Sequence, residues 1–114
     1  MPTPVPLEEF RRSSQAYLFE GDRHGDVDFS FFFVEAEPGN GASLHLHPYP
    51  EVFLVHAGQG TFTVGEQTVV VEAGHVLVIP PETPHGFTNT GTGILRTFSV
   101  HPSGTVRQTN LTAR

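Results

Sequence analysis

Short runs of Phe, Val and Thr recur along most of the chain, separated by glycine and proline. Such residues favour β-strands, and the frequent Gly and Pro between them are typical of all-β sandwiches and barrels. No long segment has the periodicity of an amphipathic helix. The pattern therefore predicts an all-β fold, a single antiparallel domain that is closed or nearly closed. The expected strands are Ala16–Glu20, Asp28–Glu37, Ala42–His47, Glu51–Ala57, Thr61–Val64, Thr68–Glu72, His75–Pro80, His85–Asn89, Ile94–His101 and Thr105–Gln108.

The expected β-domain spans residues 16–109, with a segment of different character at each end. Residues 1–15 contain three alternating prolines and favour an extended arm, with room for one helical turn. Residues 110–114 are predicted to form a flexible tail. Between Thr61–Val64 and Thr68–Glu72, the dipeptide Gly65-Glu66 suits a tight hairpin turn.

Several predicted strands are apolar on both faces. In Glu51–Ala57, Phe53 and Val55 lie on one face, whereas Val52 and Leu54 lie on the other. A second layer must cover the additional apolar face, and it can come from another sheet, the N-terminal arm or a partner subunit. We therefore predict a homodimer.

The first ten residues have neither a basic start nor an apolar run, so they do not resemble a signal peptide. The longest uninterrupted apolar stretches, Phe31–Val34 and Val76–Pro81, are far shorter than the roughly 18 residues of a membrane helix. A cytoplasmic protein is the expectation.

Composition narrows the chemistry. The 114 residues include twelve acids, six arginines and seven histidines, with no lysine or cysteine, and the formal net charge is −6. Lack of cysteine excludes disulfides, thiol nucleophiles and cysteine-ligated metals, and lack of lysine excludes Schiff-base chemistry. The acidic balance argues against nucleic acid or an anionic membrane as a partner. A chain rich in histidine and carboxylate is instead typical of a metal site.

Four residues form a candidate metal site. His45 and His47 alternate within a predicted strand, so both imidazoles project from the same face. Glu51 opens the next strand after a proline-rich turn, and His85 begins a later strand just after a proline. Three His nitrogens and one Glu oxygen leave two open positions on an octahedral ion, where a substrate, water or dioxygen can bind.

The spacing of these residues resembles the two motifs of the cupin superfamily, in particular small single-domain bacterial cupins. The resemblance covers about residues 39–89, and it implies a jelly-roll β-barrel with the metal inside. It assigns His45, His47, Glu51 and His85 as ligands of one divalent transition metal, which can be Fe, Mn, Ni, Co, Cu or Zn. Glu82 departs from the pattern, because the second motif usually has glycine there to permit a tight turn. The pattern reads Gly39-x5-His45-x-His47-x3-Glu51-x6-Gly58, fifteen further residues, and Gly74-x5-Pro80-x4-His85-x3-Asn89.

The other four histidines are expected to be ordinary. His24 lies in a polar loop, His75 follows a turn glycine, and His56 has the opposite parity to Glu51. His101 ends the last long strand, and a pocket role for it is an open alternative because parity is easily lost at a bulge.

Strand parity also suggests residues that line a substrate pocket. Phe53 shares the face of Glu51, and Phe87 shares that of His85. In the predicted strand Ile94–His101, the alternate residues that include Arg96 and Phe98 are expected to face inward. An inward Arg96 must pair with a carboxylate such as Glu35 or Glu37, or meet an anionic substrate.

These observations favour a metal-dependent enzyme acting on a small organic molecule bound in the barrel. Resemblance to cupins implies oxygenase-like, isomerase, decarboxylase or lyase chemistry, with Glu51 as a candidate base. The alternative is a non-catalytic module that binds or senses a small molecule or a metal, because the sequence shows no lid and no acid or base beyond the ligands.

Overall fold

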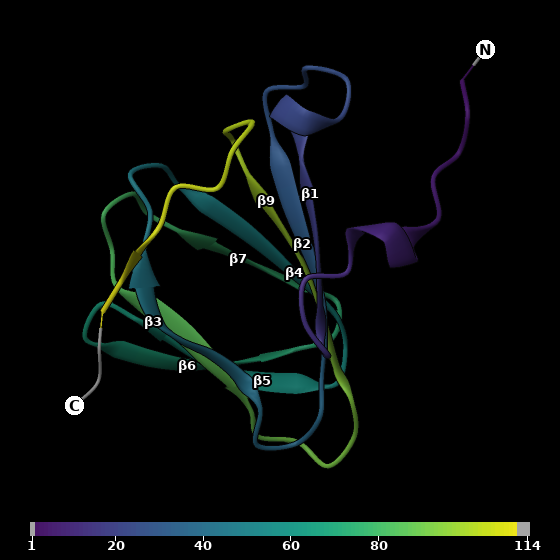
Figure 1. Cartoon of the computed structure of the whole chain (residues 1–114). Coiled ribbons are helices and arrows are strands. Elements are labelled where there is room, and N and C mark those ends of the chain that lie inside the picture. The colour runs from purple at the N-terminus through teal and green to yellow at the C-terminus, as the bar shows by residue number, and fades with distance from the viewer. Residues whose placement is uncertain (1, 112–114) are drawn as a thin grey trace.

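Two five-stranded antiparallel sheets face each other and enclose the interior of the protein (Figure 1). A computed structural model describes residues 2–111 of the chain. The first sheet has the strand order β1-β2-β9-β4-β7, and the second has the order β10-β3-β8-β5-β6. The elements are η1 (Leu7–Phe10), β1 (Ala16–Glu20), η2 (Gly21–Arg23), β2 (Ser30–Ala36), β3 (Gly41–Leu46), β4 (Glu51–Ala57), β5 (Gln59–Val64), β6 (Gln67–Glu72), β7 (His75–Ile79), β8 (His85–Asn89), β9 (Leu95–His101) and β10 (Thr109–Asn110).

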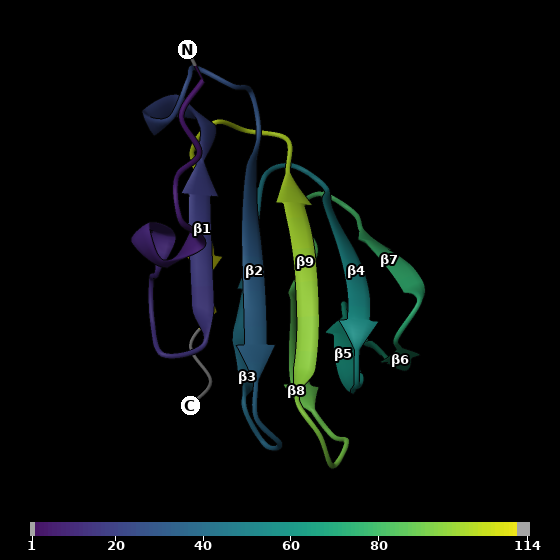
Figure 2. The ribbon, with the colours of Figure 1, turned by 90° about the vertical axis from the view of Figure 1, so that its right-hand side faces the viewer.

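The predicted antiparallel jelly roll is confirmed, but it is a two-sheet sandwich rather than a closed barrel. Strands that are neighbours in a sheet often come from distant parts of the chain, as in other jelly rolls. Within residues 2–111, no strand ladder joins the two sheets. Figure 2 shows the first sheet in front, with the strands of the second sheet behind it.

Most strands lie where the sequence predicts them, and β1, β4 and β8 have the predicted bounds. The prediction of a strand at Thr105–Gln108 is wrong, because backbone groups in this segment bond to other parts of the protein instead of to a neighbouring strand. Val106 N donates to the Glu20 carboxylate, and the carbonyl of Arg107 contacts the His47 ring. The chain joins the second sheet only afterwards, as β10.

Alternation along β4 divides this strand between the interior and the outer surface. Phe53 and Val55 are buried in the core between the sheets, whereas Val52 and Leu54 lie on the outer face. Phe62 of β5 and Phe87 of β8 meet Phe53 from the second sheet, with ring centroids 5.2 and 5.9 Å from that of Phe53. The three rings make an apolar layer between the sheets.

The β5–β6 hairpin turns at Gly65-Glu66, as the sequence predicts. Val64 pairs with Gln67 on either side of the two-residue loop. Gly65 has φ +62° and Glu66 has no positive φ, which is the pattern of a type II′ turn.

The N-terminal segment extends away from the sandwich before the chain enters β1 (Figure 1). It includes one short 3₁₀ helix, η1, whose Phe10 packs on Phe19 of β1, and Arg11 then bonds to the hydroxyl of Tyr17. The side chain of Gln15 donates to the Gly41 carbonyl at 3.0 Å. At the other end, Asn110 of the predicted tail lies in β10, and residues 112–114 are outside the described part of the chain. Among the described residues, no helix has the length and apolar character needed to cross a bilayer.

Candidate metal centre

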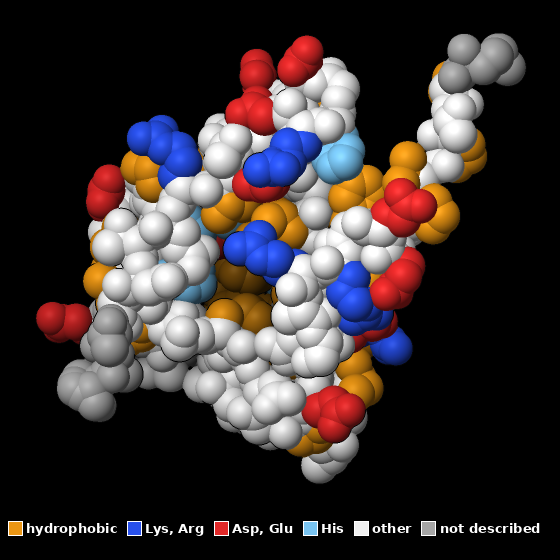
Figure 3. Space-filling view, in the orientation of Figure 1, with side chains coloured by type: hydrophobic (Ala, Val, Ile, Leu, Met, Phe, Trp, Pro, Cys, Tyr) orange, Lys and Arg blue, Asp and Glu red, His pale blue; other side chains and the backbone are white. Residues whose placement is uncertain are grey.

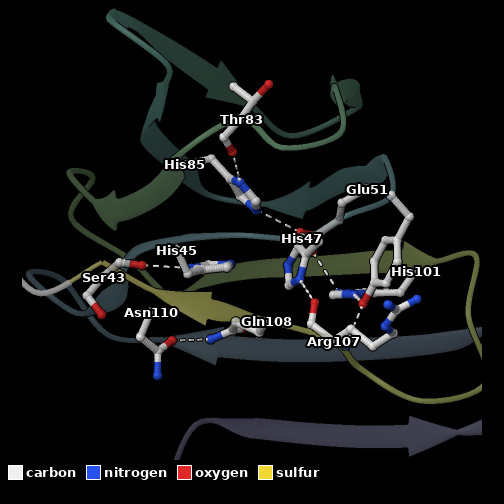
Figure 4. A network of polar contacts seen from close by, with 11 residues as sticks. Ser43, His45, His47, Glu51, Thr83, His85, His101, Arg107, Gln108 and Asn110 are labelled. Atoms are coloured by element: carbon white, nitrogen blue, oxygen red, sulfur yellow. Dashed lines mark hydrogen bonds and ion pairs between the residues drawn. The ribbon is translucent and has the colours of Figure 1, made fainter.

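The two sheets bring His45, His47, Glu51 and His85 together at one end of the interior. His45 of β3 is paired with His85 of β8, and His47 follows β3 directly. Glu51 opens β4 in the opposite sheet, after the Pro48–Pro50 turn. One ligand atom from each residue lies within 4.8 Å of the others, and all four residues are buried (Figure 4).

Each ligand histidine is oriented by a hydrogen bond from its Nδ1 to a backbone carbonyl. A carbonyl oxygen only accepts, so Nδ1 carries a proton, and such a ring presents an Nε2 lone pair to a metal ion once Nε2 is free of a proton. This arrangement is common behind metal-binding histidines. The three contacts join His45 to Ser43 (2.7 Å), His47 to Arg107 (2.8 Å) and His85 to Thr83 (2.8 Å).

The geometry around Glu51 fits a bound cation. Its Oε1 lies 2.9 Å from Nε2 of His85 and 3.2 Å from Nε2 of His47. Lone pairs on these nitrogens repel a carboxylate oxygen unless a proton or a metal ion lies between them. Nε2 of His47 is buried and has no hydrogen-bond partner. The nitrogen and oxygen donors therefore suit one divalent transition metal.

Burial and the neighbouring histidines shift the acid–base equilibria of the site. Burial alone would raise the pKa of Glu51, but contacts with His101, His47 and His85 outweigh it and hold this pKa far below its usual range. Burial lowers the pKa of His45, which favours the neutral, metal-binding form.

The structure places a fourth histidine, His101, beside Glu51, and a pocket role for His101 was the open alternative. Its Nε2 lies 3.0 Å from Oε2 of Glu51, and its Nδ1 lies 2.8 Å from the hydroxyl of Tyr49. Tyr49 also stacks on the ring of His47, with centroids 5.1 Å apart. The missed signal is the alternation of β9, in which Leu95, Thr97, Ser99 and His101 form the buried set.

The predicted inward orientation of Arg96 and Phe98 is therefore wrong. Arg96 lies on the outer face of the first sheet, where its Nε donates to Glu35 at 3.0 Å. Phe98 packs there against Phe31, with ring centroids 5.0 Å apart. Large apolar residues suggest the core side of a strand, but this sheet carries an apolar outer face, and the small polar residues of β9 turn inward.

The remaining three histidines lie away from the site. His56 is exposed on the outer face of β4 and stacks on Phe33, and His75 is exposed at the start of β7. His24 is exposed in a loop, with its ring against Phe19.

A cavity of about 300 Å³ opens beside the metal-binding group. Its walls include the predicted pocket residues Phe53 and Phe87, and both His45 and Glu51 line it as well. Figure 3 shows a hollow in the same face, with hydrophobic side chains on its floor. A small molecule in this cavity would reach the metal-binding group directly.

Comparison with known proteins agrees with the geometry. The cupin domain family matches residues 32–101, which is more than half of the chain. The chain belongs to the cupin family. No curated protein matches the sequence of this cupin.

Solved structures share the cupin fold at low sequence identity. A structure of oxalate decarboxylase superposes with a TM-score of 0.84 and 22% identity, over 97% of this cupin and 33% of the matched chain. A variant of the Bacillus subtilis enzyme gives a TM-score of 0.83 and 22% identity, over 92% and 31%. Another of these structures concerns the Mn(II) centres of the Bacillus subtilis enzyme. This cupin spans about a third of the length of those chains.

Glu82 shows how the cupin tolerates its departure from the second motif. It has φ +57°, the left-handed conformation that glycine adopts freely. Its backbone N–H donates to the carbonyl of His47 at 2.7 Å, so the turn connects the two motifs. The turn therefore forms without glycine, with backbone strain at Glu82.

Proposed function

We propose that this cupin is a metal-dependent enzyme that acts on a small organic molecule bound in its interior cavity. The supporting observation is that His45 and Glu51 belong both to the metal-binding group and to the cavity wall. A metal held there supplies Lewis acidity or a site for dioxygen. The reaction classes proposed are oxygenase-like, isomerase, decarboxylase or lyase chemistry.

The protein residues position the substrate and exclude water. Phe32, Phe53 and Phe87 make much of the cavity wall apolar, while Ser99 and Gln108 add neutral polar groups. No arginine or lysine is among the described lining residues. A molecule with an apolar body and a small oxygen-bearing head suits such a cavity better than a multiply charged anion.

Glu51 is the proposed base, in a role that requires its carboxylate to leave the metal. Its low pKa keeps the carboxylate ionised at neutral pH, and it lies at the cavity wall beside the imidazoles. A group of low pKa is a weak base, so this role suits abstraction of an acidic proton from a molecule in the cavity.

The test is turnover by untagged, metal-loaded protein with catechols, thiols, flavonols and 1,3-diketones. Oxygen consumption or product formation should be lost on chelation and restored by metal. His85→Ala should abolish it, whereas His56→Ala, which changes a histidine on the outer face, should not. Turnover that persists in His85→Ala would contradict the proposal.

The alternative function is a non-catalytic module that binds or senses a small molecule. One observation favours it: the ionisable groups among the described lining residues are His45, Glu51 and His101, and the first two belong to the metal-binding group. Binding of a panel compound that raises the unfolding temperature without turnover would support this alternative over the enzyme.

The predicted homodimer also belongs to this proposal, with the outer face of β4 and β7 as its interface. Val52 (40% exposed) pairs with Val78 (58% exposed), and Leu54 (37% exposed) pairs with Val76 (62% exposed). β7 is an edge strand and contains no Asp, Glu, Lys or Arg, so it lacks the charges that usually protect an edge.

Light scattering should find twice the 12.4 kDa mass of the chain. Val76→Asp should shift the protein toward single chains, whereas Val70→Asp, on an exposed position of β6, should not. A wild-type species of only one chain mass would contradict the dimer. The cytoplasmic location stays a prediction from the sequence.

A further inference from the structure

His101 lies beside the metal-binding group, where it lines the same cavity, and its ring centroid is 4.6 Å from that of His47. It is 1% exposed and lies at the end of β9. Oε2 of Glu51 is 3.0 Å from Nε2 of His101, whereas Oε1 is the oxygen near His47 and His85. The two oxygens of one carboxylate are therefore engaged by different partners.

The hydrogen bonds of Tyr49 indicate which nitrogen of His101 carries the proton. Arg107 N–H donates to the Tyr49 oxygen at 3.1 Å. The Tyr49 O–H is then free to donate to Nδ1 of His101, 2.8 Å away. A His101 ring that accepts at Nδ1 carries its proton on Nε2, the nitrogen 3.0 Å from Oε2 of Glu51.

This polarity is opposite to that of the three ligand histidines. Their Nδ1 atoms donate to carbonyl groups and leave Nε2 as a lone pair, whereas His101 receives at Nδ1 and presents an N–H. If His101 were a further metal ligand, its Nδ1–H would donate to the Tyr49 oxygen beside Arg107 N–H, and the Tyr49 proton would need an acceptor other than His101. Nε2 of His101, like Nε2 of His47, has no hydrogen-bond partner of regular geometry, so its 3.0 Å approach to Oε2 and its place outside the group of four are what set His101 apart.

We propose that Tyr49 and His101 form a positioning relay that holds Oε2 of Glu51, so that only Oε1 is directed at the ligand imidazoles. A carboxylate held in this way contributes one oxygen to a bound ion and leaves the remaining coordination positions open. The relay serves the metal site itself, so it does not depend on whether the cupin is an enzyme or a binding module. Partners behind the ligands commonly contribute 10- to 100-fold to metal affinity.

The test compares Co²⁺ binding by wild type, Tyr49→Phe, His101→Leu and His101→Gln. Titration measures the affinity for Co²⁺, and the visible spectrum of the bound ion reports its coordination. Tyr49→Phe removes only the hydroxyl and keeps the ring against His47, and His101→Gln keeps an N–H donor. His56→Leu, on the outer face, is the matched control. Circular dichroism and urea unfolding check that each variant is folded.

We expect Tyr49→Phe and His101→Leu to bind one Co²⁺ with an affinity roughly 10- to 100-fold lower. Their visible bands should be weaker than those of wild type, because a released Glu51 can bind the ion through both oxygens and raise its coordination number. His101→Gln should restore much of the affinity and the wild-type spectrum. A Tyr49→Phe variant with unchanged affinity and spectrum would overturn the relay, and it remains informative if His101→Leu fails to fold.

Discussion

Binding of a divalent metal should raise the unfolding temperature of this cupin by an amount that can be estimated. A ligand that binds only the folded state, at 100 times its Kd, stabilises by about 2.7 kcal/mol. For 114 residues, an unfolding entropy of about 2.1 cal/mol/K per residue amounts to roughly 240 cal/mol/K. The ratio of the two gives a rise in Tm of about 11 °C.

The assay is thermal unfolding of untagged, chelator-treated protein, followed by circular dichroism with and without Co²⁺. His85→Ala should lose the rise, because it removes one of the four buried donors. His56→Ala should keep the rise, because His56 is exposed on the outer face of β4. A full rise of Tm in His85→Ala, or none in wild type, would refute the assignment of the ligands.

Four other predictions concern stability. Phe62→Ala should cost about 3–5 kcal/mol in urea unfolding, because the ring is 1% exposed between two other phenylalanines; a cost below about 1 kcal/mol would contradict this packing. Glu82→Gly should change the free energy of unfolding by less than about 1 kcal/mol, because the relief of left-handed backbone strain offsets the extra freedom of glycine in the unfolded chain. Gly58→Ala should be clearly destabilising, because Gly58 has φ +78° and a Cβ there would lie 2.5 Å from a backbone oxygen. The pKa of Glu51 is lower in the folded than in the unfolded protein, so its ionised form stabilises the metal-free protein above about pH 4.5. The difference in the free energy of unfolding between wild type and Glu51→Gln should therefore shrink as the pH falls below that value. A difference that grows in acid would contradict the direction of the pKa shift.

Local pattern was sufficient to predict much of the fold. β4 has the predicted bounds, and its alternating residues divide between core and surface as expected. The metal-binding group was also predictable, because its four residues lie in two short motifs and a strand places alternate side chains on one face. Here the sequence signal and the local geometry coincide.

Which residues of β9 face the interior was not predictable, because the more hydrophobic set of residues in this strand lies on the outer face. Ile94, Phe98 and Val100 suggest the core side, but register pairs Phe98 with Leu54 on the outer face. The interior instead accommodates small polar side chains beside the site. Which face of a strand is the interior depends on its partners in the sheet, and the partners of β9 are distant in sequence.

For the same reason His101 could not be assigned from the sequence. It lies 50 residues beyond Glu51 and outside both motifs, and only the pairing of β9 with β4 brings the two side chains together. Tyr49 lies within the first motif, but its contact with His101 requires the same long-range pairing.

The central claim is that one metal ion binds between His45, His47, Glu51 and His85. Anomalous diffraction from crystals of untagged protein grown with Co²⁺, recorded at the cobalt edge, tests it most directly. We predict one strong peak per chain, within bonding distance of the three Nε2 atoms and of a Glu51 oxygen. A peak only at an exposed histidine such as His24 or His75, or no peak at the buried group, would contradict the account.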